Sequence, residues 1–339
     1  MTHAGAGQWS VPPAPPPTRR TRRASRRVRL ARRRALAVTL VLVVAASIAT
    51  FALARPNDAE AGAPESPSAA APPSSADSPT PSPSRTPTPT PTPTPSTAAV
   101  CDDPAVLDAL ASGTDVEVIA AVGGGEPFRA AVASGAAPCI DPTEAGRTWV
   151  VVNKRNALDP LDYWPTPQAQ PQGIRVVSGG GWLRVDAAEA LDGLAAAIVA
   201  DGVGALGVDS AFRPYAYQVD LYNGYVASRG QAAADLRSAR PGHSEHQTGL
   251  AVDVVACDGG CGSHDGFKGT AEADWLVDNA WRFGFIIRYE DGETATTGYS
   301  WEPWHLRYIG VALAEAYQDG GYRTLEDFFG LPAAPDYDA

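Results

Sequence analysis

The residues Ala35–Ala54 form an apolar run that only three hydroxyl residues interrupt. A helix of this length spans about 30 Å, which is the thickness of the hydrocarbon core of a bilayer. Ten arginines lie directly before it, in Arg19–Arg34, and basic residues beside a span stay on the cytoplasmic side. The pattern predicts a transmembrane signal anchor at 35–54 that follows a basic cytoplasmic tail at 1–34.

A cleaved signal peptide is the alternative, because Ala52-Leu53-Ala54 and Ala59-Glu60-Ala61 both fit a small-x-small cleavage pattern. In both cases the rest of the chain is exported. We expect a single-pass cell-membrane protein with its N-terminus in the cytoplasm, or else a secreted protein. Because membrane orientation explains the arginine block, we expect no nucleic-acid partner.

The charge of the chain divides in the same way. It holds 27 Lys and Arg against 38 Asp and Glu, but the first 55 residues contain eleven of the basic residues and no acid. The remainder is therefore strongly acidic. It begins with Pro56–Thr97, where 13 of 42 residues are Pro and 15 are Ser or Thr. Such a segment cannot bury a core and prefers an extended geometry. We predict a disordered linker at 55–100 that holds an outer region away from the membrane.

Four cysteines in an exported chain indicate two disulfides. By proximity we pair Cys101 with Cys139 and Cys257 with Cys261. A metal site made of Cys257, Cys261 and His264 is the alternative for the second pair, although its spacing is not that of a usual zinc knuckle. We expect 101–146 to be a small disulfide-stapled segment that leans on the domain after it. Its expected helices lie near Pro104–Ala111 and Pro127–Ser134.

The stretch 147–330 is long enough for one domain, and 331–339 is left as a tail. Its periodicity favours helices and clustered strands without a βαβ series, which predicts an α+β fold with an antiparallel sheet. Asp186 and Glu189 form a possible capping box at the start of a helix that ends near Gly202. The other expected elements are helices at Tyr215–Arg229 and Glu272–Phe283 and strands at Thr148–Asn153, Thr248–Val255 and Phe285–Tyr289.

The residues that can carry chemistry are His246, Asp253, Glu302 and His305. Catalytic zinc takes three protein ligands and leaves one position open, and His246, Asp253 and His305 can supply these ligands. On the expected strand Asp253 points away from the apolar face, and Gly249 would let the chain bend so that His246 and Asp253 converge. Zinc chemistry still needs a general base to accept a proton, and Glu302 is the natural candidate.

This part of the chain resembles the VanY-type D-alanyl-D-alanine carboxypeptidases, zinc peptidases that share a fold with the hedgehog signalling domain. The resemblance covers roughly the last 190 residues and leaves out the tail, the span, the linker and the Cys101–Cys139 segment. The motifs that carry it are Asn153-Lys154, Ser210-Ala211-Phe212-Arg213, Gln218, Leu221-Tyr222, Ser238-Ala239-Arg240-Pro241-Gly242, Ser244-x-His246-x-x-Gly249-x-Ala251-x-Asp253, Trp275-Leu276, Phe283-Gly284-Phe285, Arg288-Tyr289, Thr297-Gly298-Tyr299 and Glu302-Pro303-Trp304-His305-x-Arg307-Tyr308.

The resemblance implies one zinc ion on His246, Asp253 and His305, with Glu302 as catalytic base. It also implies that Arg213 binds the substrate or stabilises an oxyanion, and that Gln218 and Ser238 bind the terminal carboxylate region.

The implied function is release of the terminal D-alanine from peptidoglycan stem peptides by a membrane-anchored, monomeric enzyme. An L,D-carboxypeptidase or D,D-dipeptidase of the same fold, and a non-catalytic wall-binding or sensor module, are the alternatives.

Overall fold

The computed structural model describes residues 99–337, and its centre is a five-stranded sheet with the strand order β2-β4-β5-β7-β6. Neighbouring strands are antiparallel except β2 and β4, which pair in parallel at one edge. Helices and sheet are mixed, as expected for an α+β fold, but the parallel pair was not predicted. The strands of the sheet are β2 (Arg175–Val176), β4 (Leu206–Ser210), β5 (Ala251–Ala256), β6 (Phe285–Tyr289) and β7 (Glu302–Tyr308). A separate antiparallel pair consists of β1 (Gln168–Ala169) and β3 (Leu183–Arg184).

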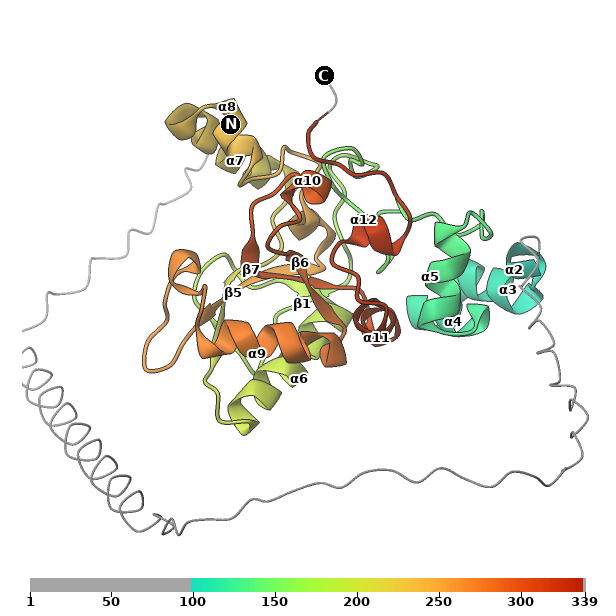
Figure 1. The fold of residues 1–339 in the computed structure, drawn as a ribbon, viewed down its shortest axis with the longest axis horizontal. Helices are drawn as coiled ribbons and strands as arrows, with labels where there is room; N and C mark the ends of the chain where they lie inside the picture. Colours follow the sequence, from blue (N-terminus) through green and yellow to red (C-terminus); the bar gives the residue numbers. More distant parts are fainter. Residues whose placement is uncertain (1–98, 338–339) are drawn as a thin grey trace, which may run out of the picture. The chain divides into compact units, whose positions relative to one another are not determined.

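The helices α6 and α9 lie on the same side of the sheet (Figure 1). The predicted apolar face of α6 is confirmed, since Leu191, Leu194 and Ile198 are all fully buried in the core that the sheet shares. Each such aliphatic side chain contributes about 1.5–3 kcal/mol on burial. The predicted helix Glu272–Phe283 changes type on the way, because its last turn is a 3-10 helix, η3. The bounds are α6 (Val185–Ala200), α9 (Ala271–Asn279) and η3 (Ala280–Phe283).

The remaining elements of this part of the chain connect the strands or follow the last one. The helix α7 begins and ends where the sequence predicted. The bounds are α7 (Tyr215–Arg229), α8 (Gln231–Asp235), η1 (Glu245–Thr248), η2 (His264–Gly266), α10 (Thr294–Thr297), α11 (Val311–Asp319) and α12 (Leu325–Phe328).

Four short helices precede the sheet and share a second core with α11 and α12. Phe128 and Val118 are fully buried in this core against Trp149, Leu313 and other residues of the sheet domain. The segment therefore leans on the following domain, as expected, and a Cys101–Cys139 disulfide staples it. The helix α4 was missed, although Thr114 and Glu117 form a capping box at its start. The bounds are α2 (Ala99–Asp102), α3 (Pro104–Ser112), α4 (Asp115–Val122) and α5 (Gly125–Ala133).

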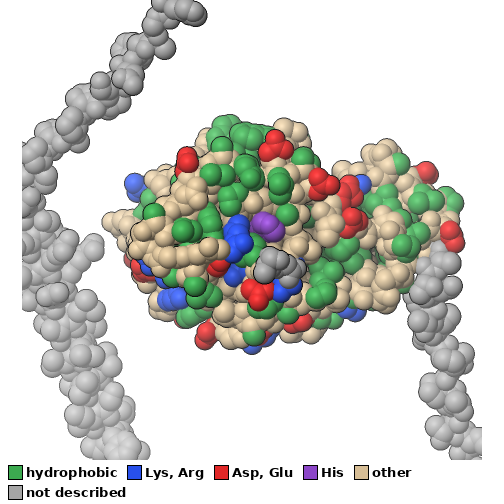
Figure 2. Space-filling view, turned by 90° about the horizontal axis from the view of Figure 1, so that it is seen from above, with side chains coloured by type: hydrophobic (Ala, Val, Ile, Leu, Met, Phe, Trp, Pro, Cys, Tyr) green, Lys and Arg blue, Asp and Glu red, His purple; other side chains and the backbone are tan. Residues whose placement is uncertain are grey.

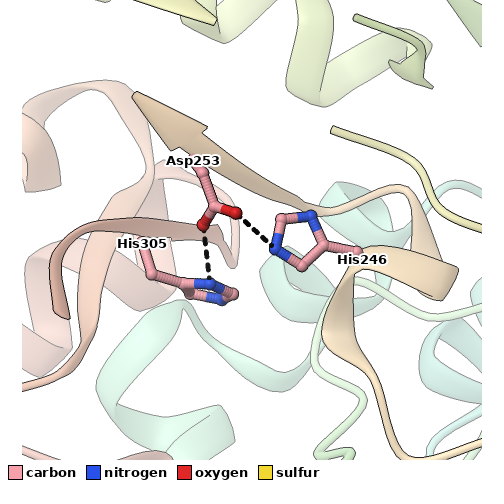
Figure 3. Close-up of side chains that lie close together, drawn as sticks. All are labelled: His246, Asp253 and His305. Carbon is pink, nitrogen blue, oxygen red and sulfur yellow. Dashed lines mark hydrogen bonds and ion pairs between the residues drawn. The ribbon is translucent and has the colours of Figure 1, made fainter. Parts of the chain in front are cut away.

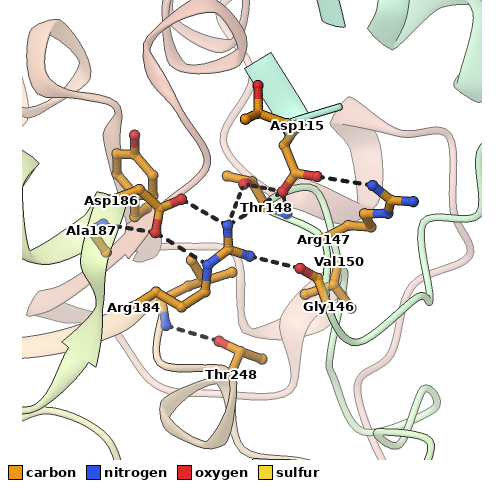
Figure 4. Close-up of polar contacts among 12 residues, drawn as sticks. Asp115, Gly146, Arg147, Thr148, Val150, Arg184, Asp186, Ala187 and Thr248 are labelled. Atoms are coloured by element: carbon orange, nitrogen blue, oxygen red, sulfur yellow. Dashed lines mark hydrogen bonds and ion pairs between the residues drawn. The ribbon is translucent and has the colours of Figure 1, made fainter. Parts of the chain in front are cut away.

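The first residue of α4 ties this segment to the sheet domain (Figure 4). The Asp115 carboxylate accepts hydrogen bonds from the backbone N–H and the hydroxyl of Thr148, at 2.7 and 2.6 Å. The same carboxylate lies 3.4 Å from the guanidinium groups of Arg147 and Arg184. The junction between the two cores is thus a charged hydrogen-bond network as well as an apolar contact.

The predicted strand Thr148–Asn153 is wrong, because the segment is buried but pairs with no strand. Its backbone groups are satisfied elsewhere: the Arg307 guanidinium donates to the carbonyls of Thr148 and Val150, and the Val151 N–H donates to Pro142 O. An apolar β-branched run looks the same in sequence whether a strand or an arginine takes its hydrogen bonds.

Two predicted boundaries are also wrong. Asp186 does not cap α6, since it is the second residue of the helix and its carboxylate pairs with Arg184 at 2.7 Å. The strand β5 starts at Ala251, because Thr248 belongs to the 3-10 turn η1 and Gly249 is left-handed with φ 73°.

The predicted membrane span at 35–54 and the linker at 55–100 lie outside the described residues, apart from the last two linker residues. Within 99–337, no helix is both long and apolar enough to cross a bilayer. At the other end, residues 331–337 pack against the domain: Ala334 is fully buried, and the ring of Tyr337 lies 4.1 Å from the Arg240 guanidinium carbon.

Candidate metal centre and active site

The three predicted metal ligands come together where the neighbouring inner strands β5 and β7 meet the turn η1, which precedes β5. Asp253 and His305 are directly paired across the antiparallel strands β5 and β7, so their side chains leave the same face of the sheet. His246 lies in η1, and the left-handed Gly249 turns the chain from η1 into β5. A Cβ at Gly249 would come within 3.0 Å of Pro165 Cγ, so both conformation and space require glycine there.

The Asp253 carboxylate lies between the two imidazole rings (Figure 3). Its Oδ2 is 3.2 Å from His246 Nε2, and its Oδ1 is 3.1 Å from His305 Nδ1. One ligand atom from each of the three residues can be chosen so that all lie within 4.8 Å of one another. All three side chains are buried.

The outer nitrogen of each imidazole is held by a separate acceptor. His246 Nδ1 is 2.7 Å from the carbonyl oxygen of Ala211, and His305 Nε2 is 3.2 Å from Glu245 Oε2. When these nitrogens carry the protons, the lone pairs of His246 Nε2 and His305 Nδ1 face Asp253. The buried His246 Nε2 has no hydrogen-bond partner among the described residues. Two imidazole nitrogens and a carboxylate that face one another are a ligand set for a cation once both imidazoles are neutral, and N/O donors of this kind suit zinc.

The electrostatics of the three residues follow from burial and from one another. Burial and the charge of Arg213 lower the pKa of His246 to about 4, so that its imidazole is neutral. Burial alone would lower the pKa of His305, but the carboxylates of Asp253 and Glu245 raise it to about 9. Burial alone would raise the pKa of Asp253, but the imidazoles of His246 and His305 hold it well below its ordinary value. Asp253 is therefore ionised near neutral pH.

Glu302 is the first residue of β7 and borders the same cavity as the three ligands. Burial raises the pKa of its carboxyl to about 7, and the nearby charge of Asp253 acts in the same direction. A carboxyl with a pKa near the working pH can both accept and return a proton. The predicted general base is thus in a suitable place with a suitable acidity.

The ligands lie in the wall of an open cavity of about 370 Å³. The wall also includes Arg213, Arg237, Ser238, His264 and Trp304. Arg213 is held by a 3.0 Å hydrogen bond from Nη1 to Ser210 Oγ, and the same nitrogen lies 3.6 Å from Asp253 Oδ2. On the face drawn in Figure 2, histidine surface lies near the centre with basic side chains beside it.

Gln218 does not border this cavity, which corrects its predicted role in substrate contact. Its side chain is fully buried, and Nε2 donates to Ser238 Oγ at 3.2 Å and to the carbonyl of Ala239 at 2.7 Å. The geometry instead makes Gln218 a support for Ser238, which does line the cavity.

The predicted disulfide between Cys257 and Cys261 is confirmed, which contradicts the alternative of a metal site with His264. Two residues of the cavity wall were given no role from the sequence. His264 borders the cavity, stacks on Trp304 with ring centroids 5.2 Å apart, and lies 2.9 Å from Asp209 Oδ2. Arg237 also borders the cavity, and no sequence pattern singled it out.

Glu245 was likewise missed, although it directly precedes a ligand. Its fully buried carboxylate contacts His305, Arg288 and Arg307. Adjacency to His246 was the only available signal, because its arginine partners lie 43 and 62 residues away.

Comparison with known proteins agrees with this geometry. Residues 181–311 match the model of the VanY family, described as D-alanyl-D-alanine carboxypeptidase. A putative carboxypeptidase, YodJ, from Bacillus subtilis (strain 168) is 37% identical over 182 residues, which cover 53% of this chain and 66% of that protein. A D-alanyl-D-alanine carboxypeptidase from Enterococcus faecalis (strain ATCC 700802 / V583) is 34% identical over 183 residues, which cover 50% of this chain and 62% of that one.

A solved structure of the LdcB LD-carboxypeptidase is 35% identical and covers 55% of this chain and 86% of its own, with a TM-score of 0.51. The chain spans just under two thirds of the length of the two curated relatives. It belongs to the VanY-type carboxypeptidase family.

Proposed function

We propose that this protein is a zinc-dependent D-alanyl-D-alanine carboxypeptidase that removes the terminal D-alanine from peptidoglycan stem peptides. The observation that carries the proposal is the convergence of His246, Asp253 and His305 beside Glu302 in an open cavity of a VanY-type chain. Three buried N/O ligands with an accessible side are the pattern of a catalytic zinc site.

The residues of the chain divide the chemistry between them. Zinc held by His246, Asp253 and His305 would supply a Lewis acid that polarises the scissile carbonyl and makes water more acidic. Glu302, which borders the same cavity, accepts the proton of the attacking water and then donates it to the leaving amine. Arg213 donates a hydrogen bond to the carbonyl oxygen as negative charge develops there.

The terminal carboxylate of the substrate binds at the basic side of the cavity. Arg237 and Ser238 border the cavity on that side, and guanidinium groups pair well with carboxylates. Gln218 contributes through Ser238, whose hydroxyl it fixes. The protein as a whole acts as a monomer outside the cell, anchored by the span at 35–54 or released after signal cleavage.

An L,D-carboxypeptidase is the second candidate, because the LdcB LD-carboxypeptidase matches over more than half of this chain. The two activities need the same metal chemistry, and they differ in the chirality that the cavity accepts next to the released residue. A D,D-dipeptidase and a non-catalytic wall-binding module are the further alternatives.

The test is release of D-alanine from three peptides by the purified protein, with and without a chelator. Chelator-sensitive release from a pentapeptide ending in D-Ala-D-Ala is the expected result. Release only from a tetrapeptide would establish the L,D activity, and cleavage only of free D-Ala-D-Ala would establish the dipeptidase. No release from any of them, by protein shown to contain zinc, would favour the non-catalytic module.

A further inference from the structure

The carboxylate of Glu245 makes a different contact with each of its two oxygens. Oε1 accepts hydrogen bonds from Arg288 Nε at 2.9 Å and from Arg307 Nη1 at 2.8 Å. Oε2 lies 3.2 Å from His305 Nε2. The side chain is completely buried. Oε1 thus pairs with the two arginines, while Oε2 contacts only His305, a predicted metal ligand.

The two arginines that hold Glu245 are themselves held from several sides. Arg288 makes a bidentate pair with Glu326, at 2.8 and 3.0 Å. Arg307 donates to the carbonyls of Thr148 and Val150. We name Glu245, Arg288, Arg307 and Glu326 the charge network. Its two carboxylates and two guanidiniums cancel in charge and are all fully buried, which offsets the cost of removing them from water.

The charge network also decides which oxygen of Glu245 faces His305. Oε1 is occupied by the N–H donors of Arg288 and Arg307, so Oε2 is the oxygen at His305 Nε2. A carboxylate that is paired with two guanidinium groups accepts hydrogen bonds, so His305 Nε2 is the nitrogen that donates. The nitrogen left to bind a metal is then Nδ1, the atom that faces Asp253.

We propose that Glu245 is a positioning residue that fixes the tautomer and the ring orientation of His305 for metal binding. The inference rests on the proposed function, because it assigns a role toward the metal of that site. The alternative is that Glu245 only neutralises the buried arginines. Glu326 has that role without touching a predicted metal ligand, because its side chain contacts Arg288 and Asn153. Glu326 therefore provides a matched control from the same network.

The test compares Glu245→Gln with Glu326→Gln in the full-length protein. Both variants remove one carboxylate from the charge network. Both variants also turn one accepting oxygen into an amide N–H, because Glu245 and Glu326 each accept with both oxygens. Only in Glu245→Gln can that amide N–H face His305. Zinc affinity is measured by competition with a chromophoric chelator, and the coordination of Co²⁺ by its visible absorption spectrum.

We expect Glu245→Gln to bind zinc about 10- to 100-fold more weakly and to change the Co²⁺ spectrum. Glu326→Gln should stay within about threefold of the unsubstituted protein. Equal losses in the two variants would overturn the proposal, because charge balance alone would then explain both.

A measurement on the unsubstituted protein keeps the proposal testable if Glu245→Gln does not fold. Long-range proton–nitrogen NMR of the zinc-loaded protein reports which nitrogen of His305 carries the proton. We expect the proton on Nε2, and a proton on Nδ1 would overturn the proposal. Zinc binding without D-alanine release would refute the proposed function and leave this inference intact. A protein that binds no zinc would refute both.

Discussion

The charge network and the cavity wall are made of the same kinds of side chain but differ in how completely they are paired. In the charge network, none of the four side chains has a buried nitrogen or oxygen that lacks a hydrogen-bond partner. In the cavity wall, His246 Nε2 and Arg213 Nε are buried and have no hydrogen-bond partner among the described residues. Unpaired buried polar atoms are costly in a folded protein. The contrast therefore separates groups whose hydrogen bonds are complete within the protein from groups that can still bind a ligand.

Glu302→Gln should have the largest effect on catalysis. The amide keeps the size of the side chain but cannot accept the proton from water, so kcat/KM should fall about 10²- to 10⁴-fold. Zinc content, measured by metal analysis, should remain at one ion per chain. Near-full activity would remove Glu302 from its role as general base, whatever the substrate.

Arg288→Met changes the charge network instead, and it should cause a large loss of stability. It leaves Glu245 and Glu326 buried without their shared cation, which costs about 3–5 kcal/mol of the free energy of unfolding. Denaturant unfolding followed by tryptophan fluorescence measures this loss. A loss below about 1 kcal/mol would contradict the view that the charge network serves the fold.

The pH dependence of stability tests the cavity wall through Glu302. Burial raises the pKa of Glu302 from 4.5 to about 7, so the unfolded chain ionises first as the pH rises. Glu302 by itself should therefore lower the stability of the metal-free protein by on the order of 3 kcal/mol between about pH 4.5 and 7, while the lowered pKa of His246 acts in the opposite direction. Glu302→Gln removes this loss, so the metal-free variant should be the more stable protein above pH 7. Parallel stability–pH curves for the two proteins would contradict this account.

Gln218→Ala should have the smallest effect of the four. The substitution leaves Ser238 Oγ without its 3.2 Å donor but touches neither the ligands nor Glu302. Loss of one such hydrogen bond costs about 1 kcal/mol, so KM should rise about fivefold with little change in kcat. Gln218→Ala and Ser238→Ala should not be additive, and additive effects would separate the two residues.

The sequence predicted the ligand set better than it predicted the support around it. Alternation along β5 placed Asp253 opposite Leu250, Val252 and Val254, and the short motif around Gly249 kept His246 close to it in the chain. The alternation and the motif both involve residues close in sequence, so they can be recognised without knowledge of the fold. Glu245 and Gln218 were missed or misread because their partners are distant in sequence or lie behind the cavity wall.

The strand predicted at Thr148–Asn153 was wrong for a related reason. Hydrophobic pattern reports burial, and the segment is indeed buried, but it does not report what receives the backbone hydrogen bonds. Here the partner is the side chain of Arg307, which is contributed by β7. Long-range polar contacts of this kind were not visible in any window of sequence.

The contacts of Arg307 and Arg288 also set the smallest piece of this chain that can keep its active site. The family-matched residues 181–311 contain both arginines but lack Glu326 and the carbonyls of Thr148 and Val150. They also lack Asp115, which holds Thr148 in place from the first residue of α4. A fragment cut at the family limits would lose four of the seven hydrogen bonds that these two buried guanidinium groups donate. The helices of 99–133 therefore support the residues around the candidate metal site, even though they lie outside residues 181–311, which match the family.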